Sequence, residues 1–473
     1  MAGPILREIF VRLRARLAEL PPLVPLAIAW GVLVAYAFPG QLTQDSIDHL
    51  TEARSGFYTD AHPPVINLVW KVFDHVVAGP CLMLALQTTM LLAGLYLVLR
   101  RTFSVRRAAW LAAAAFVFPP IALPMAVIWK DCIMAGAFAL GFGLLWSPRK
   151  GLRLGALAVL FLATAVRYNA FAATFPMILF VFEWSPGARW WKRYAISLAA
   201  WIAITFAAFQ LNERLTDRPM HYWHTSIAVF DIAGTLVEAD EAFSDERLAT
   251  LLEGTSLRTT DRLYERLKAA YEPKHFIHLI SSAKIDPIWD LPTGGHTPPP
   301  PEVRAAIERA WKDVVTTYPW AYVKHRLAVT AAVLSIGKNN KVYGIVPPRD
   351  LKWPQVAKDM GLATSASSTQ RWLTNGAHWS VKWIPMYRPW MYVVLALVLL
   401  WFARRHRDVF VLLLSGLAIE STYVVLAPSA DYRYSHWLVI CVVLSVITLV
   451  ARRAKKREVQ EQRPGDERDL QRG

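Results

Sequence analysis

The sequence predicts an all-α, polytopic membrane protein. Three observations lead to this fold class. Of the 473 residues, 55% are hydrophobic and only 19% are charged, and the mean hydropathy is positive at +0.29, whereas a soluble domain normally has about a quarter charged residues. The apolar residues gather in long uncharged runs, and basic residues stand at the ends of those runs. This arrangement is typical of bilayer spans and argues against a soluble enzyme.

Ten apolar runs approach the length of about 17 to 25 residues that crosses a bilayer core. They are 22–39, 80–99, 108–128, 132–147, 152–167, 170–184, 194–211, 389–403, 408–427 and 436–451. The first run follows a basic stretch and lacks a small-residue cleavage site, so it is expected to be an uncleaved helix and not a signal peptide. We therefore expect about ten transmembrane helices.

The basic residues predict the orientation of these spans. Lys and Arg number 25 in the two termini and the loops on one side, against five in the short loops on the other side. The positive-inside rule then places both termini in the cytoplasm. The net charge of +16 is explained by this topology, so the expected partner is the lipid bilayer and no nucleic acid. Three Cys, each in an apolar stretch, provide neither a disulfide framework nor a cysteine metal site.

A long polar segment divides the chain into four parts. We expect an N-terminal transmembrane module (1–211) with a catalytic first outer loop (40–79), an outer, mostly helical insertion (212–388), C-terminal transmembrane helices (389–451) and a disordered cytoplasmic tail (452–473). Helical stretches are expected near 243–254, 260–270 and 303–337. The insertion is also expected to pack on the membrane part, because seven tryptophans suit an interfacial position: Trp289, Trp311, Trp320, Trp353, Trp372, Trp379 and Trp383.

The first outer loop contains the candidate general base. Asp45, Asp48 and His49 fall at i, i+3 and i+4, so on a short helix they share a face. A carboxylate there can accept the proton of a sugar or lipid hydroxyl. Two alternatives stay open: Asp45 caps the helix, or the aspartates and histidines of this loop, which include Asp60 and His62, hold a divalent metal ion.

Three cations at separate helix ends form a candidate phosphate site. Lys130, Arg167 and Arg433 are all expected at the outer membrane boundary, where Arg offers paired donors to a phosphate and Lys a compact charge. The alternative is local pairing of Lys130 with Asp131 and of Arg433 with Asp431.

Two further features have a functional and a structural interpretation. Glu420 lies inside a predicted span, where an ionisable residue is a functional candidate, and a partner on a neighbouring helix is the alternative. His221 and His224 stand at i and i+3, a weak metal pattern that an amphipathic interfacial helix also explains.

Together these motifs resemble membrane glycosyltransferases of the GT-C fold, the superfamily of the protein O-mannosyltransferases and the aminoarabinose transferases of lipid A. The resemblance, closest to bacterial family 39-like members, rests on the order and common side of five short motifs. These are Asp45 soon after the first span, HisProPro at 62–64, TrpLysAsp at 129–131, ArgTyrAsn at 167–169 and AspTyrArgTyr at 431–434. The sequence departs from the pattern in two ways: Asp45 is followed by Ser46 and not by a second acid, and the large outer domain lies before the last three spans.

The resemblance implies a polyprenyl phosphate-linked sugar donor, of the undecaprenyl phosphate type in a bacterial plasma membrane, and an active site on the periplasmic or extracellular side. Asp45 would be the base, with Asp48 as the second catalytic candidate, and Lys130, Arg167 and Arg433 would stabilise the departing phosphate. The candidates for binding sugar or acceptor are His49, Asp60, His62, Asp131, Tyr168, Asn169, Asp431 and Tyr434. The acceptor is a glycan, lipid or protein, and the only cofactor left open is a divalent metal ion.

Two other classes of protein share part of this pattern. A transporter or flippase for a lipid-linked sugar also has many spans, although internal repeats are typical of transporters and none is visible here. A polysaccharide polymerase or ligase uses similar substrates, but is expected to depend on Arg and His in its outer loops and not on an aspartate in the first loop.

Overall fold

A computed structural model of the chain describes residues 19–185, 187–258, 261–281, 286–291, 297–337, 354–362 and 365–461. The described chain is helical, and its β structure is limited to isolated bridges. The helices before the insertion are α2 (Leu23–Ala37), α3 (Gln44–Ser55), α4 (Pro64–Val76), α5 (Cys81–Leu99), α6 (Val105–Phe116), α7 (Pro119–Met125), α8 (Lys130–Leu145), α9 (Lys150–Val166), η1 (Tyr168–Ala170), α10 (Phe171–Val181) and α11 (Trp190–Leu215).

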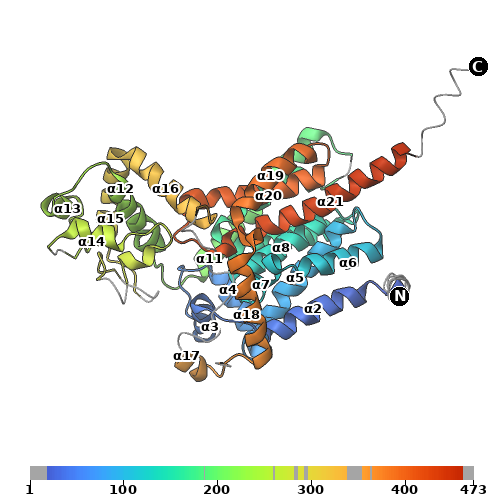
Figure 1. Ribbon diagram of the computed structural model, residues 1–473, viewed down its shortest axis with the longest axis horizontal. Coiled ribbons are helices and arrows are strands. Elements are labelled where there is room, and N and C mark those ends of the chain that lie inside the picture. The colour runs from blue at the N-terminus through green and yellow to red at the C-terminus, as the bar shows by residue number, and fades with distance from the viewer. Residues whose placement is uncertain are drawn as a thin grey trace, which may run out of the picture.

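The insertion and the C-terminal part supply the remaining helices. In the insertion these are the π-helix η2 (His224–Ala228), α12 (Val229–Glu238), α13 (Asp245–Leu251), α14 (Leu263–Ala270), η3 (Phe276–Leu279), α15 (Pro301–Thr317), α16 (Pro319–Val333), α17 (Pro354–Asp359) and α18 (Ser368–Trp383). The chain then forms η4 (Pro385–Tyr387), α19 (Pro389–Ala403), α20 (Arg407–Leu426), η5 (Tyr432–Ser435) and α21 (His436–Glu461). Figure 1 shows α12 to α16 gathered at one end of the bundle that α2, α5, α8 and α19 to α21 form.

Four of the described helices are long and apolar enough to cross a membrane: Cys81–Leu99, Trp190–Leu215, Arg407–Leu426 and Tyr432–Glu458. The predicted span 108–128 is not one straight helix, because α6 and α7 meet at a 68° bend just before Pro119 and Pro120. If the bent pair is counted as one span, the number of such spans is five. Helix α2, Tyr168–Val181 and α19 are shorter apolar helices. The larger number of ten spans stays a prediction.

Helix α8 lies between α5 and α9 and is buried on nearly all sides. Its small residues make this position possible. A Cβ atom at Gly136 would lie 2.8 Å from the carbonyl oxygen of Gln87 on α5, and one at Gly141 would lie 2.7 Å from Leu160 on α9. Such close approach of apolar helices through glycine is typical of membrane bundles. It places Lys130 and Asp131, at the start of α8, in the middle of the molecule.

The helices expected in the insertion are present. The predicted stretch 303–337 is two helices, α15 and α16, because the chain turns at Tyr318 before Pro319. The interfacial role predicted for Trp289 is wrong: its side chain is fully buried and its indole donates to the Thr255 hydroxyl at 3.1 Å. Trp311 also turns inward, toward Asp231. Trp353 lies outside the described residues.

The final helix is longer than predicted. Helix α21 continues to Glu461, so the tail is helical beyond Arg452 and not disordered from that residue onward. The Arg452 guanidinium is held by Asp408 and by the Thr102 hydroxyl. The rest of the predicted tail, 462–473, lies outside the described residues, as do the basic residues before residue 19.

Candidate functional site

The first turn of α3 positions Asp45. Thr43 is the N-cap of this helix and forms a capping box with Ser46, so the alternative that Asp45 caps the helix is wrong. The Ser46 hydroxyl donates to the carbonyl of Ile128 at 2.8 Å, and the Trp129 indole donates to the Thr43 hydroxyl at 2.9 Å. These bonds hold Asp45 next to the start of α8.

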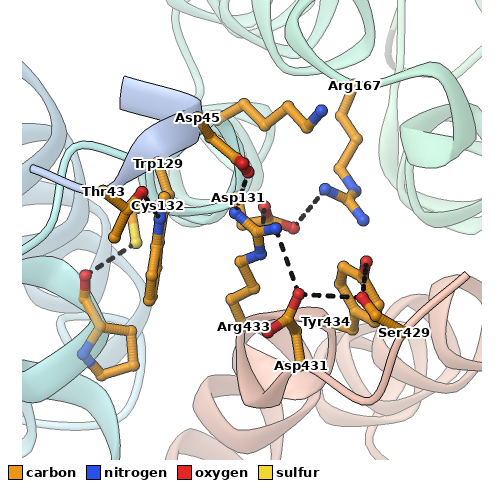
Figure 2. Close-up of polar contacts among 12 residues, drawn as sticks. Thr43, Asp45, Trp129, Asp131, Cys132, Arg167, Ser429, Asp431, Arg433 and Tyr434 are labelled. Carbon is orange, nitrogen blue, oxygen red and sulfur yellow. Dashed lines mark hydrogen bonds and ion pairs between the residues drawn. The ribbon is translucent and has the colours of Figure 1, made fainter. Parts of the chain in front are cut away.

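Arg433 is the centre of the site. Its guanidinium contacts Asp45 at 2.5 Å and Asp431 at 3.2 Å, and its Nε lies 3.8 Å from Asp131 (Figure 2). It also lies 5.1 Å above the centre of the Trp129 ring. The loop between α20 and α21 (427–435), which the sequence predicts to be the last outer loop, therefore meets the first outer loop (40–79) and the start of α8 at one guanidinium.

Arg167 contacts the same buried carboxylate as Arg433, that of Asp131. Its guanidinium contacts Asp131 at 2.6 Å, and its Nε donates to Asn169 at 3.1 Å. The guanidinium also lies 5.0 Å from the centre of the Tyr434 ring, which is stacked on Tyr423 at 4.7 Å. Asp131 is fully buried. Two arginines therefore share one buried carboxylate, and each keeps part of its donor fork for other partners.

Lys130 does not pair with Asp131, contrary to the local alternative. Its ammonium group lies 2.6 Å from Nδ1 of His62. Burial, followed by the charge of Lys130, lowers the pKa of His62 well below its usual value, so neutral His62 accepts the hydrogen bond. Burial and the nearby charge of Arg167 lower the pKa of Lys130 to about 7. Lys130 precedes the predicted span 132–147. Of the three cations Lys130, Arg167 and Arg433, it is the one that loses its proton most easily.

His49 is oriented by a short chain of polar groups. The Asn67 amide donates to Glu52 at 2.6 Å, which turns its carbonyl oxygen toward Nδ1 of His49 at 2.6 Å. Nδ1 must then carry the proton, because the amide oxygen can only accept. The His49 ring lies 4.7 Å from that of His62. Burial lowers the pKa of His49 to about 4, so both imidazoles are neutral near pH 7.

Asp45 stays ionised in this arrangement. Its enclosed position acts to raise its pKa, but the charges of Arg433 and Lys130 outweigh this effect and lower the pKa far below its usual value. The cluster that we name the ion cluster consists of Asp45, Lys130, Asp131, Arg167, Asp431 and Arg433. Its charges balance when Lys130 is protonated.

Three predicted site residues point elsewhere. Asp48 accepts from the Gln44 amide at 2.6 Å on the exposed side of α3. Asp60 accepts from the backbone N–H of Met220. Tyr168 is 36% exposed, with its ring 6.0 Å from that of Phe209. Asn169, by contrast, bridges Arg167 to the Thr422 hydroxyl, and the Tyr434 hydroxyl lies 3.1 Å from that of Ser429, which donates to Asp431.

The insertion contributes positioning contacts that sequence reasoning missed. One segment pairs with the first outer loop through the Thr59–Arg218 bridge. A second pairs with the last outer loop: the Ala430 N–H donates to the carbonyl of Lys274 at 2.9 Å, and His275 forms a bridge with Ser429. The insertion therefore holds both loops that meet at the ion cluster. No local pattern in the sequence indicates such pairings between distant segments.

A buried network connects the last outer loop to the centre of the insertion. Arg326 on α16 donates to the carbonyl of Ala427 at 3.1 Å and pairs with Asp231 on α12. Asp231 also accepts from the Trp311 indole at 2.9 Å and contacts His325 at 3.2 Å. Burial lowers the pKa of His325, so Arg326 is the cation that balances Asp231.

The metal patterns are not assembled in the described part of the chain. No three His, Cys, Asp or Glu side chains are grouped there as a metal ion would need. In the HisTyrTrpHis motif, the Arg304 guanidinium contacts Nε2 of His221 at 2.5 Å, and Nε2 of His224 contacts Glu308 at 2.8 Å. Glu420 accepts from the Ser435 hydroxyl at 2.7 Å, the structural alternative for that residue.

No protein-family model matches the chain, and the comparisons with curated proteins and with solved structures gave no match. The resemblance to the GT-C superfamily therefore depends on the five sequence motifs alone. Residues from four of these motifs, Asp45, Lys130, Arg167 and Arg433 among them, lie in or beside the ion cluster, and His62 of the fifth contacts Lys130. The fold brings these residues together, and the spacing of the motifs along the sequence does not predict that they meet.

Proposed function

We propose that the protein is an integral membrane glycosyltransferase. It moves a sugar from a polyprenyl phosphate-linked donor, of the undecaprenyl type, to a hydroxyl group of a glycan, lipid or protein. The observation that carries the proposal is the ion cluster, in which two arginines and a lysine lie at one end of the apolar helices. Lipid phosphates lie at the ends of membrane-spanning helices, and paired arginine donors suit them.

The reaction divides the cluster into two sides. On the acceptor side, a carboxylate takes the proton of the hydroxyl as its oxygen bonds to the anomeric carbon. On the donor side, the bond between the anomeric carbon and the phosphate oxygen breaks, and its electron pair leaves with the polyprenyl phosphate. Arg433, Arg167 and Lys130 stabilise the charge that develops there. Asp45 is the carboxylate of the acceptor side.

Asp45 is a weak base while Arg433 holds it, and the donor relieves this restraint. A phosphate competes with Asp45 for the Arg433 guanidinium, since both are anions that accept paired hydrogen bonds. When Arg433 turns to the phosphate, Asp45 loses its strongest partner and its pKa rises. Donor binding thus prepares the base.

The wider proposal follows the sequence-based expectations. The chain adopts a GT-C-like arrangement of about ten spans in a bacterial plasma membrane, with both termini in the cytoplasm and the ion cluster at the periplasmic or extracellular side. The positive-inside distribution of Lys and Arg supports this orientation.

The test uses the purified full-length chain in lipid nanodiscs with an undecaprenyl phosphate-linked sugar and a hydroxyl acceptor. We expect the wild-type chain to release undecaprenyl phosphate, measured by mass spectrometry. Arg433→Gln should lower the rate at least about a hundredfold, the usual effect of removing one donor to a developing charge. Arg193→Gln is the matched control, because it breaks an ion pair with Glu183 away from the cluster.

The same preparation separates the competing classes of function. Transfer of lipid-linked sugar across proteoliposome membranes, with no release of undecaprenyl phosphate, would identify a transporter and refute the proposal. Equal rates for Arg433→Gln and Arg193→Gln would refute the role of the ion cluster even if transfer occurs.

A further inference from the structure

Helix α18 has three chemically different faces. At about 3.6 residues per turn, its residues divide into three adjoining stripes. The packed face consists of Leu373, Thr374, Ala377 and Val381; the tryptophan face of Trp372, Gly376, Trp379 and Trp383; and the polar face of Arg371, Asn375, His378 and Lys382. An ordinary surface helix needs only two faces, one for the core and one for water.

The exposed fractions of the side chains follow the same division into faces. On the packed face, Thr374 and Ala377 are buried, and Leu373 and Val381 pack against the hydrophobic core. On the tryptophan face, by contrast, Trp372, Trp379 and Trp383 are 72%, 62% and 63% exposed. The three largest side chains of the helix therefore extend away from the protein on one side.

The helix lies across the end of the apolar bundle. In Figure 1, α18 crosses the direction of α2, α5 and α21 instead of running along them. At its start, the Gln370 amide donates to the carbonyl of Phe38, directly after α2, at 2.6 Å. The Arg54 guanidinium of the first outer loop reaches the carbonyl of Met360, just before α18, at 2.7 Å. The helix thus lies at the end of the bundle that carries the ion cluster.

Charge and continuity identify what covers the tryptophan face. The neighbouring helix α2 also exposes apolar side chains: Val32 is 58% exposed, and Phe38, directly after the helix, is 57% exposed, as expected for a surface in contact with lipid. Residues 368–383 include no acidic side chain, while Arg371 and Lys382 are on the polar face. Tryptophan rings settle at the boundary between headgroups and acyl chains, and cations beside them suit anionic headgroups.

We propose that α18 is an in-plane helix seated on an anionic lipid leaflet at the ion-cluster end of the bundle. Its packed face holds the protein, its tryptophan face enters the upper acyl region about 5 to 10 Å deep, and its polar face stays at the headgroups and water. Each of its three faces then has a matching environment. The proposal is independent of the glycosyltransferase assignment.

The test places a spin label on each of two neighbouring residues. Gly376→Cys puts the label on the tryptophan face and Asn375→Cys puts it on the polar face, about 100° away around the helix. Neither change removes a tryptophan or a charge, and nothing lies within 4 Å of a Cβ atom built at Gly376. Cys81 is replaced by Ser in both, since Cys132 and Cys441 are buried and Cys81 is not.

Full-length chains are labelled and reconstituted in nanodiscs of phosphatidylcholine with phosphatidylglycerol. The ratio of oxygen to nickel-chelate accessibility should be severalfold higher for the label at 376 than for the label at 375. Equal ratios would show that the tryptophan face is in water and would overturn the proposal. Dipolar broadening between labels at 376 on two chains would overturn it as well, because a second copy would then cover this face.

The lipid charge is tested with the same label. In phosphatidylcholine alone, or in the variant R371Q/K382Q, the label at 376 should become more accessible to the nickel chelate. An unchanged ratio in both would refute the preference for anionic lipid.

Discussion

The contact between Arg326 and Asp231 gives the most quantitative prediction. The two side chains are 4% and 1% exposed, and His325 beside them is neutral, so Arg326 alone balances the buried carboxylate. Arg326→Met keeps the length of the side chain but leaves Asp231 unpaired. Removing one partner of a buried ion pair costs about 3 to 5 kcal/mol, and the lost hydrogen bond to the Ala427 carbonyl adds about 1 kcal/mol.

A double-mutant cycle separates the charge from the packing. In Asp231→Asn combined with Arg326→Met, no buried charge remains, so the loss in the free energy of unfolding should be smaller than in Arg326→Met alone. Unfolding is measured in mixed detergent micelles for the two single variants and the double variant. A double variant as unstable as the sum of the single variants would refute the reasoning, because the two residues would then act independently.

The remaining predictions concern packing and protonation. Gly234→Ala should destabilise the protein by about 1 to 3 kcal/mol, because its Cβ would lie 1.9 Å from Nδ1 of His325. Gly376→Ala is the control, because nothing lies within 4 Å of a Cβ atom at that position. Equal melting temperatures for the two variants would contradict this packing. Binding of undecaprenyl phosphate, measured by microscale thermophoresis, should weaken as the pH rises through about 7, where Lys130 loses its proton. Lys130→Met should abolish this pH dependence, and its persistence would assign the titration to another group.

The sequence was a good guide to the candidate site because charged side chains close to predicted membrane spans are unusual and easy to recognise. Charges are costly near a membrane unless they are paired, so Arg167 and Arg433 could be selected with no structure at hand. Of their partners, the sequence predicted only Asp431 for Arg433, as the local alternative. Asp131 follows Lys130 in the chain, yet it faces Arg167, since successive residues of a helix point in directions about 100° apart.

The environment of each tryptophan in the insertion could not be predicted from the sequence, for a different reason. The distribution of tryptophans suggested an interface, but tryptophan suits a protein core and a membrane boundary equally. Trp289 lies in the core, whereas Trp379 extends from α18. Only the packing of neighbouring helices separates the two environments.

The sequence by itself determined that the chain is helical and apolar and that its unusual charges stand at helix ends, because composition and periodicity are local properties. The tertiary structure decided that these charges form one cluster around Arg433, and that the insertion holds the two loops that build it. It also decided which face of α18 packs against the protein. Such contacts join residues far apart in the chain, as Arg433 and Asp45 are, and depend on how closely helices such as α5 and α8 can approach.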